Sequence, residues 1–302
     1  MEPRGRFAPS PTGELHLGNA RTALLSWLWA RSEGGGYAMR VEDIDRPRVR
    51  PGMAEQQIEE LRWLGLDWDG APVFQSQRTH LYEDALRRLG EQVYPCFCSR
   101  AEIAAATSAP HGDEGPRYPG TCAQLTRAQR VETQKARTPA LRLRVPPGVI
   151  TFDDALLGPQ AFDVQAMTGD FVLRRADGIF AYQLAVTVDD GAMGITQVLR
   201  GADLISSTPR QILLHRLLGQ PEPRWAHAPL VLSSAGERLS KRDKALSLSA
   251  LRGQGADPRK LVADLARLSG IQTSPACEPD ELLSGFSLAR IPRTAAPAGN
   301  LA

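Results

Sequence analysis

Residues 9–19 read PSPTGELHLGN, and this stretch decides the fold. The short apolar run at residues 6–8 precedes it as a strand candidate, which the two prolines of the stretch halt. After the stretch, apolar residues recur at helical spacing over residues 17–31. A second strand candidate at residues 37–41 ends in the acidic run Glu42-Asp43-Ile44-Asp45. The sequence therefore predicts a βαβ unit with a right-handed crossover.

The loop and Glu42 are both expected at the carboxyl edge of the parallel sheet, where ligands of such folds bind. Neither G-x-G-x-x-G nor G-x-x-x-x-G-K-[ST] occurs in the sequence. Instead, His16 is placed where the helix begins, so its imidazole and the first backbone N–H groups can face one anion. Gly18 lets a flat base approach the backbone because it has no Cβ. A Pro/Gly turn with a capping histidine explains the loop equally well, and the loop alone does not decide.

A second basic element, residues 237–244, reads ERLSKRDK. A mobile lysine such as Lys241 suits a triphosphate, because negative charge shifts onto the leaving pyrophosphate during transfer. The alternative for such a run is a solvated basic turn. The two motifs together, in this order and far apart, indicate a triphosphate-binding enzyme more specifically than either motif alone.

The composition is that of an ordinary globular protein: 302 residues, 42% hydrophobic and 23% charged. The net charge of +2 gives no basic field, so any nucleic-acid surface must be local. We find neither a signal peptide nor an apolar stretch long enough to span a bilayer. Four cysteines without a secretory signal indicate a reducing compartment. We expect a cytoplasmic, monomeric protein without a membrane partner.

Further elements are expected along the chain, and they divide it into four parts. Amphipathic helices are predicted at residues 53–64 and 78–90, and strands at 140–145, 170–174 and 180–186. Composition changes after Cys98, and a capping-box pattern follows. The four parts are the first half of a nucleotide-binding domain at 1–98, an insertion at 99–185, the second half at 186–245, and a helical segment with a loose tail at 246–302.

With these motifs in order, the sequence resembles the class I aminoacyl-tRNA synthetases of the glutamate type. Residues 16–19 match the HIGH motif, with Leu17 and Asn19 at its second and last positions, and residues 238–242 match the KMSKS motif. Further matching blocks lie at residues 6–13, 40–45, 182–185, 189–190 and 200–204. The resemblance implies an α/β fold: a Rossmann-like class I catalytic domain with an inserted acceptor-type subdomain and a small C-terminal helical stem-contact segment.

The resemblance also implies two sets of binding residues. ATP would contact His16, Gly18, Asn19, Leu239, Ser240 and Lys241, and glutamate would contact Arg6, Ala8, Ser10, Glu42, Tyr182 and Arg200. The two arginines would hold the side-chain carboxylate, which a guanidinium fork matches in shape. Glu42 would take the α-ammonium, with Ser10 and Tyr182 completing the pocket. His16 and Lys241 would be the catalytic residues that stabilise phosphate charge, and Mg²⁺ would accompany ATP.

Three cysteines, Cys96, Cys98 and Cys122, indicate a structural zinc site that would tether the irregular insertion. Three thiolates leave the site open, so a fourth ligand is needed. General ligand statistics favour His111, whereas the resembled family uses a tyrosine, which here is Tyr118. Small buried thiols without a metal are the alternative.

Past residue 244 only a small helical segment and a tail remain, so we expect no anticodon-binding domain. In this the chain resembles the shortened relatives that transfer glutamate to the queuosine base in the anticodon loop of tRNA(Asp). A shortened synthetase that charges the terminal adenosine of tRNA, and an inactive RNA-binding module, are the alternatives. Clustered basic residues of the insertion either track RNA phosphates or form a solvated face; they are Arg117, Arg127, Arg130, Lys135, Arg137, Arg142 and Arg144.

Overall fold

The computed structural model describes residues 2–106, 116–232 and 247–297. Of the predicted site residues, Leu239, Ser240, Lys241 and the zinc-ligand candidate His111 lie outside these ranges. Among the described residues, no helix has the length and apolar character that crossing a membrane requires. The expected cytoplasmic location and monomeric state stay predictions.

The first half of the catalytic sheet has the predicted βαβ unit. Strands β1 (Arg4–Phe7), β2 (Gly36–Val41) and β3 (Val73–Phe74) pair in parallel in the order β1-β2-β3. Helix α1 (Leu17–Ser32) connects β1 to β2, and α2 (Met53–Trp63) lies between β2 and β3 in the chain. The carboxyl ends of β1 and β2 therefore meet at one edge, as the sequence predicted.

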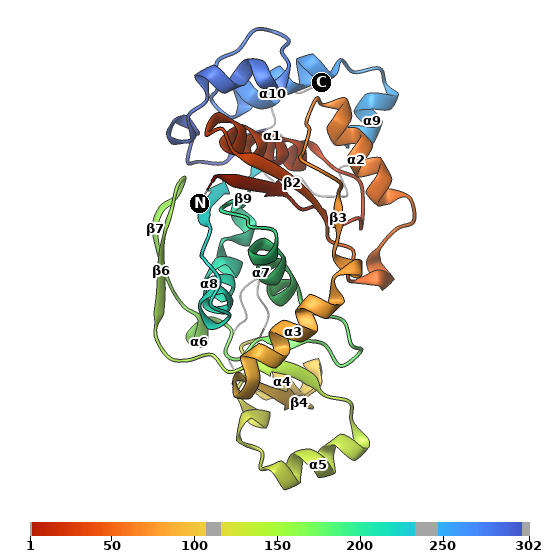
Figure 1. Cartoon of the computed structure of the whole chain (residues 1–302), viewed down its shortest axis with the longest axis vertical. Helices are drawn as coiled ribbons and strands as arrows, with labels where there is room; N and C mark the ends of the chain where they lie inside the picture. The colour runs from red at the N-terminus through yellow and green to blue at the C-terminus, as the bar shows by residue number, and fades with distance from the viewer. Residues whose placement is uncertain (1, 107–115, 233–246, 298–302) are drawn as a thin grey trace.

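The second half is a separate sheet beside the first, and its strands come much later in the chain. Strands β9 (Gln197–Gly201) and β10 (Arg224–Ala228) are parallel, with α8 (Thr208–Leu217) between them in sequence. The backbone N–H of Thr196 donates to the Arg4 carbonyl at 2.9 Å, which places β9 beside β1. The two halves thus meet at the β1–β9 boundary, below α1 in Figure 1.

A hairpin of β6 (Val149–Asp154) and β7 (Gly158–Asp163) joins the outer side of this sheet. Strand β6 pairs in parallel with β10 through Asp154 and Trp225. This hairpin falls within the expected insertion at residues 99–185, yet it is hydrogen-bonded to the catalytic sheet. The four-part division of the chain stays a prediction, and this pairing crosses its boundary.

A separate three-stranded antiparallel sheet lies at the far end of the molecule from the C-terminal helices (Figure 1). It consists of β4 (Val93–Cys96), β5 (Ala140–Leu143) and β8 (Val172–Arg174). Its first strand lies before residue 99, where we expected the insertion to begin. The neighbouring helices are α3 (Thr79–Leu89), α4 (Arg100–Ala106), α5 (Arg127–Ala136) and α6 (Val164–Met167).

The C-terminal part is helical, as expected, and packs on the opposite side from this sheet. Helices α9 (Leu248–Gly253) and α10 (Pro258–Leu268) contribute buried residues to the same hydrophobic core as α1. The short parallel pair β11 (Val231–Leu232) and β12 (Ala296–Pro297) connects the end of the described chain to the catalytic domain.

The prediction of a strand at residues 180–186 is wrong, because helix α7 (Tyr182–Ala192) occupies this segment. Residues 184–190 are all buried, and α7 contacts both α3 and α8. A helix that is covered on several sides carries apolar residues all round, so its sequence shows no clear period of 3.6. The apolar run was therefore compatible with a buried strand, and only the tertiary packing distinguishes the two.

Candidate active site

A cavity of ≈ 390 Å³ opens at the carboxyl ends of β1, β2 and β9. Every predicted ATP or glutamate residue that the structure describes lines it: Arg6, Ala8, Ser10, His16, Gly18, Asn19, Glu42, Tyr182 and Arg200. These residues span almost 200 positions of the chain, so the fold brings together a set that the sequence only suggested by resemblance. Their roles toward a ligand remain predictions.

The histidine of the loop is the N-cap of α1, as the sequence indicated. The backbone N–H of Gly18 donates to Nδ1 of His16 at 3.1 Å, and the backbone N–H of His16 donates to Oδ1 of Asn19 at 3.1 Å. A Cβ on Gly18 would lie 3.0 Å from Cε1 of His16. A side chain at position 18 would therefore displace the imidazole by a few tenths of an ångström, besides hindering any approach of a base.

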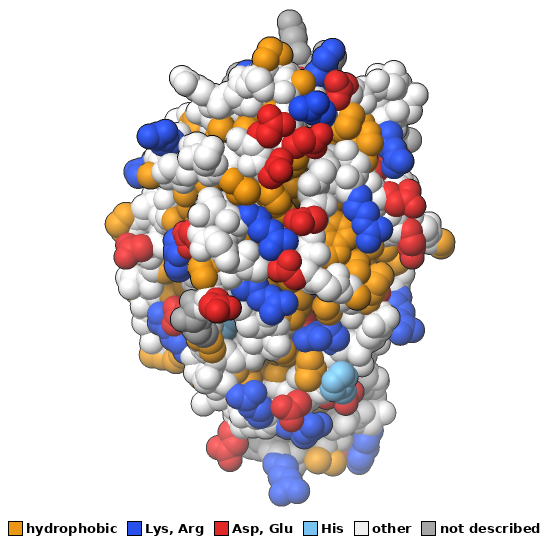
Figure 2. Space-filling model, turned by 45° about the horizontal axis from the view of Figure 1, so that its top comes forward, with side chains coloured by type: hydrophobic (Ala, Val, Ile, Leu, Met, Phe, Trp, Pro, Cys, Tyr) orange, Lys and Arg blue, Asp and Glu red, His pale blue; other side chains and the backbone are white. Residues whose placement is uncertain are grey.

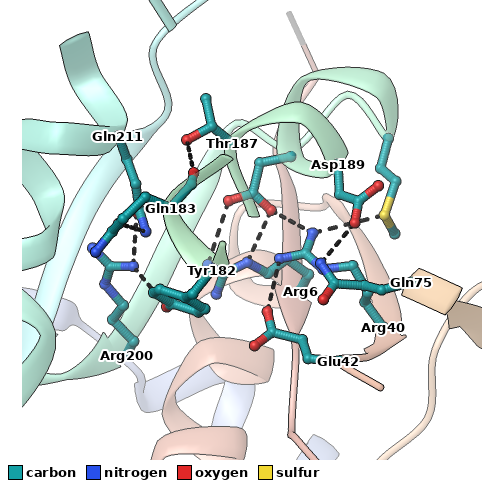
Figure 3. Close-up of polar contacts among 12 residues, drawn as sticks. Arg6, Arg40, Glu42, Gln75, Tyr182, Gln183, Thr187, Asp189, Arg200 and Gln211 are labelled. Atoms are coloured by element: carbon teal, nitrogen blue, oxygen red, sulfur yellow. Dashed lines mark hydrogen bonds and ion pairs between the residues drawn. The ribbon is translucent and has the colours of Figure 1, made fainter. Parts of the chain in front are cut away.

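On one side of the cavity, Arg6 belongs to a buried ionic cluster (Figure 3). Its Nε and Nη2 donate to the carboxylate of Asp190 in α7, at 3.2 and 3.4 Å. The same carboxylate accepts from Nη1 of Arg40 in β2 at 2.6 Å. Nη2 of Arg40 donates in turn to Oε1 of Glu42 at 3.4 Å. Two carboxylates and two guanidinium groups therefore form one charge-balanced group.

The pKa values in this cluster differ between its two carboxyl groups. Burial alone would raise the pKa of Asp190, but Arg40 and Arg6 outweigh it and hold that pKa at about 2. For Glu42, burial exceeds the attraction of the same two arginines, and its pKa is raised above the ordinary value. Asp190 is thus satisfied within the protein, whereas Glu42 would gain from a further cation.

On the other side of the cavity, Arg200 in β9 is held by neutral groups. Its Nε donates to Nε2 of His227 at 3.1 Å and its Nη2 to the hydroxyl of Thr208 at 2.8 Å. Its Nη1 donates to Oε1 of Gln211 at 2.8 Å and to the Tyr182 hydroxyl at 3.4 Å. Figure 3 shows Arg200, Gln211 and Tyr182 close together.

Among the described residues, no carboxylate pairs directly with Arg200, although its side chain is only 5% exposed. Burial lowers the pKa of this arginine, which is the mark of a cation without a compensating anion. A buried guanidinium in this state favours an anionic ligand. The geometry therefore provides a specific place for a carboxylate.

Sequence reasoning assigned no role to Asp190, Thr208, Gln211 or His227. For Asp190 a signal was present, because two adjacent aspartates at 189–190 in an apolar segment require buried partners. Asp189 has such partners outside the cavity: it accepts from Gln75 Nε2 and from the Tyr82 hydroxyl, both at 2.7 Å, and so ties α7 to α3. We find no comparable signal in the sequence around His227.

A second hollow of ≈ 1110 Å³ lies between the catalytic domain and the antiparallel sheet. It shares Ser10, Glu42 and Tyr182 with the first cavity, so the two are adjacent. Cationic side chains on its wall include Arg48, Arg100, Arg142 and Arg175. Carboxylates line it as well, namely Glu42, Asp45, Asp177 and Asp203, and Arg175 pairs with two of them, so the charge on its wall is mixed.

The three predicted zinc ligands cluster in the described structure. The Sγ atoms of Cys96, Cys98 and Cys122 all lie within 4.8 Å of one another. Tetrahedral zinc with Zn–S bonds of about 2.3 Å places sulfurs roughly 3.8 Å apart, so this cluster fits the ion. Burial, followed by the neighbouring thiols of Cys122 and Cys96, raises the pKa of Cys98 to about 12, a cost that a divalent cation would remove.

The Tyr118 hydroxyl lies beside this cluster. It is 3.4 Å from Sγ of Cys96 and accepts from the backbone N–H of Cys122 at 2.8 Å. The fourth ligand stays open between Tyr118 and His111, which lies outside the described residues. Cys277 is buried in the main core, away from the cluster.

Several basic residues of the insertion have partners within the protein. The guanidinium of Arg142 lies 3.8 Å from the ring centre of Tyr118, and that of Arg144 lies 4.7 Å from the ring of Tyr94. Arg137 pairs with Glu102 at 2.9 Å. On the face in Figure 2, basic and acidic side chains are interspersed. The contact of these residues with RNA stays a prediction.

Comparison with known proteins identifies the family. Residues 3–285 match the family model "tRNA synthetases class I (E and Q), catalytic domain". A Glutamyl-Q tRNA(Asp) synthetase from Symbiobacterium thermophilum is 54% identical, with 96% of this chain and 94% of that protein covered. The protein of the same name from Nitratidesulfovibrio vulgaris is 51% identical, with 89% and 86% covered.

A solved structure agrees with the sequence matches. The glutamate tRNA ligase from Elizabethkingia meningosepticum, determined in complex with its amino acid, superposes with a TM-score of 0.86 at 28% identity. The comparison covers 99% of this chain and 67% of that one. The expected Rossmann-like class I catalytic fold is thereby confirmed. The chain belongs to the class I tRNA synthetases for glutamate and glutamine, and within them to the family of the glutamyl-Q tRNA(Asp) synthetases.

Proposed function

We propose that this protein activates L-glutamate with ATP and transfers it to the queuosine base of tRNA(Asp). In the first step, an oxygen of the α-carboxylate attacks the α-phosphorus of ATP. Pyrophosphate leaves, and glutamyl-adenylate, a mixed anhydride, is formed. In the second step, a nucleophilic atom of the queuosine base attacks the carbonyl carbon of the anhydride, and AMP leaves. No protein nucleophile is needed in either step.

The observation that carries this proposal is the buried, uncompensated guanidinium of Arg200 in a cavity that also contains Glu42. Arg200, with Arg6 on the other side of the cavity, would bind the side-chain carboxylate of glutamate and leave the neutral amide of glutamine poorly paired. Glu42, whose pKa is raised, would bind the α-ammonium. Ser10, Tyr182 and the backbone at Ala8 would complete the pocket.

ATP would occupy the end of the cavity beside His16, Gly18 and Asn19, where α1 begins. The N-terminus of a helix attracts phosphate through its backbone N–H groups and its dipole. From the second motif, Leu239 and Ser240 would contact ATP, and Lys241 would follow charge onto the pyrophosphate. Mg²⁺ would accompany ATP, because the substrate phosphates supply oxygen ligands of the kind that this ion prefers.

Two further parts would serve the transfer step. The hollow of ≈ 1110 Å³ would admit the anticodon loop, because it reaches the glutamate site at Tyr182 and carries cations for phosphates. A structural zinc ion held by Cys96, Cys98 and Cys122, with Tyr118 as the fourth ligand, would fix the subdomain that forms its far wall.

The test is glutamate-dependent ATP–pyrophosphate exchange without tRNA, followed by labelled glutamate with queuosine-containing tRNA(Asp) or with tRNA(Glu). We expect exchange without tRNA and label in the anticodon fragment of tRNA(Asp). Label on the terminal adenosine of tRNA(Glu) would instead indicate a conventional synthetase. If neither exchange nor label is found, the protein is an inactive RNA-binding relative.

A further inference from the structure

We infer that Asp154 and His227 form a positioning pair that holds Arg200 ready for the substrate carboxylate through a neutral acceptor. Neither residue lines the cavity, so neither contacts substrate. The inference rests on the proposed function and extends it from the binding residues to the groups behind them.

Asp154 is anchored where the β6–β7 hairpin turns. Its Oδ1 accepts from the backbone N–H groups of Leu156 and Leu157, at 3.0 and 2.8 Å, and from that of His227 at 3.2 Å. Its Oδ2 lies 2.5 Å from Nδ1 of His227. Burial alone would raise the pKa of Asp154, but the interaction with His227, followed by the backbone hydrogen bonds of Leu157 and Leu156, outweighs it and lowers that pKa, so the group is a carboxylate at neutral pH.

The carboxylate determines the tautomer of His227. Because an ionised carboxylate only accepts, Nδ1 of the imidazole carries the hydrogen, and Nε2 of the neutral ring is an acceptor. Nε2 then accepts from Nε of Arg200 at 3.1 Å, and the Thr208 hydroxyl lies 3.0 Å away. A protonated imidazole would direct a second N–H at the guanidinium. Burial, aided by the charge of Arg200, outweighs the attraction of Asp154, lowers the pKa of His227 to about 4 and prevents this.

The arrangement places a negative charge near Arg200 without placing it in contact. A carboxylate at the position of His227 would pair with the guanidinium and compete with the substrate's own carboxylate. The neutral imidazole fixes the orientation of Nε instead, and leaves Nη1 and Nη2 with neutral partners only. His227 thus fixes the orientation of the guanidinium, and Asp154 supplies the nearby negative charge. Both members of the pair are therefore needed.

The experiment measures the Kd for labelled glutamate by equilibrium dialysis, and the KM values for glutamate and ATP in pyrophosphate exchange. Asp154→Asn allows the amide to donate to Nδ1, which would turn Nε2 into a donor facing Arg200. His227→Phe removes the acceptor and keeps a ring. For both variants we expect a Kd and a glutamate KM at least tenfold higher, with the ATP KM within twofold. His227→Gln, whose amide oxygen can accept from Arg200, should stay within threefold of the wild type.

A matched control is available in His215. It is equally buried, its ring nitrogens have no partner among the described residues, and it packs edge-on against Trp225. His215→Phe should leave the glutamate Kd unchanged. The inference is overturned if Asp154→Asn and His227→Phe bind glutamate within twofold of the wild type, or if His215→Phe weakens binding as much. Absence of exchange in the wild-type enzyme would overturn the proposed function, a result distinct from either of these.

Discussion

Arg6 and Arg200 lie in one cavity, but their guanidinium groups have partners of different charge. Arg6 donates to the carboxylate of Asp190, which it shares with Arg40. Arg200 donates to an imidazole, a hydroxyl, an amide and a phenol. Both arginine residues are 5% exposed, so burial does not distinguish them. The partners therefore decide how much positive charge each arginine offers to a ligand.

From this difference we expect a division of labour. The Arg6 side is an internal ion cluster, whose loss leaves other buried charges unpaired and mainly lowers stability. The Arg200 side holds a cation without an internal anion, so its loss mainly weakens carboxylate binding.

Replacing the two arginines by glutamine separates binding from stability. Arg200→Gln should lower kcat/KM for glutamate about 10³-fold, a loss of about 4 kcal/mol, since a buried charge-assisted contact is removed. Arg6→Gln should lower kcat/KM for glutamate only about tenfold, but it should reduce the melting temperature more than Arg200→Gln does. Pyrophosphate exchange and thermal unfolding measure both. Arg224→Gln, at an exposed pair with Glu33, is the control. Equal activity losses for the two arginines would contradict the division.

Asp190→Asn should break the Arg6 side alone. Arg40 is fully buried and would keep only the 3.4 Å contact with Glu42 as an ion pair. We expect a loss of about 3 kcal/mol in the free energy of unfolding, measured by urea denaturation. Glu132→Gln, which removes an exposed pair with Lys135, should cost less than ~0.5 kcal/mol. A change for Asp190→Asn as small as that of the control would show that the cluster does not stabilise the fold.

Lowering the pH should destabilise the Arg200 side and the Arg6 side of the cavity in different pH ranges, because His227 contacts Arg200 and Asp190 pairs with Arg6. His227 has a pKa of about 4 in the fold and 6.5 as its ordinary value, so the unfolded chain binds the extra proton first. The full free energy of unfolding is therefore present above pH 6.5. As the pH falls from 6.5 to about 4, His227 lowers the free energy of unfolding by about 3 kcal/mol. Asp190, with a pKa of about 2 against 3.8, contributes fully above pH 3.8 and loses this below.

The measurement is the free energy of unfolding between pH 7.5 and 4.5 for the wild type and His227→Gln. The free energy of unfolding should decline less steeply with falling pH in His227→Gln. The difference isolates His227, because His215 and all other titratable groups are common to both proteins. Parallel curves would show that His227 is not held neutral by the fold.

Of these changes, removal of zinc should have the smallest effect on glutamate binding by the two arginines. We expect about one equivalent of zinc in the purified protein, and chelation should destabilise the subdomain of Cys96, Cys98 and Cys122. The glutamate Kd should stay within twofold, because the two arginines are held by other elements. Calorimetry and equilibrium dialysis test this. A large loss of glutamate binding in the zinc-free protein would mean that the subdomain also shapes the pocket.

Local signals in the sequence were sufficient for the first βαβ unit and for its ligand edge. The loop at residues 9–19, the N-cap His16 and the strand-ending Glu42 lie where the pattern placed them, because each depends on residues close in sequence. The cysteine cluster was predicted from the C-x-C pair at residues 96–98 and the single cysteine at position 122, although 24 positions separate Cys98 from Cys122. The segment at 180–186 failed because an apolar run that is covered on several sides has no diagnostic period.

What the sequence by itself determined is thus the edge at which a ligand binds and, through resemblance, which side chains meet there. Only the tertiary structure decided how those side chains are charged and held. Asp190 is 184 positions from Arg6, and Asp154 is 73 positions from His227. Such pairs leave no local pattern, because neither propensity nor periodicity extends over that separation. The charge that each arginine can offer to glutamate is therefore a property of the fold.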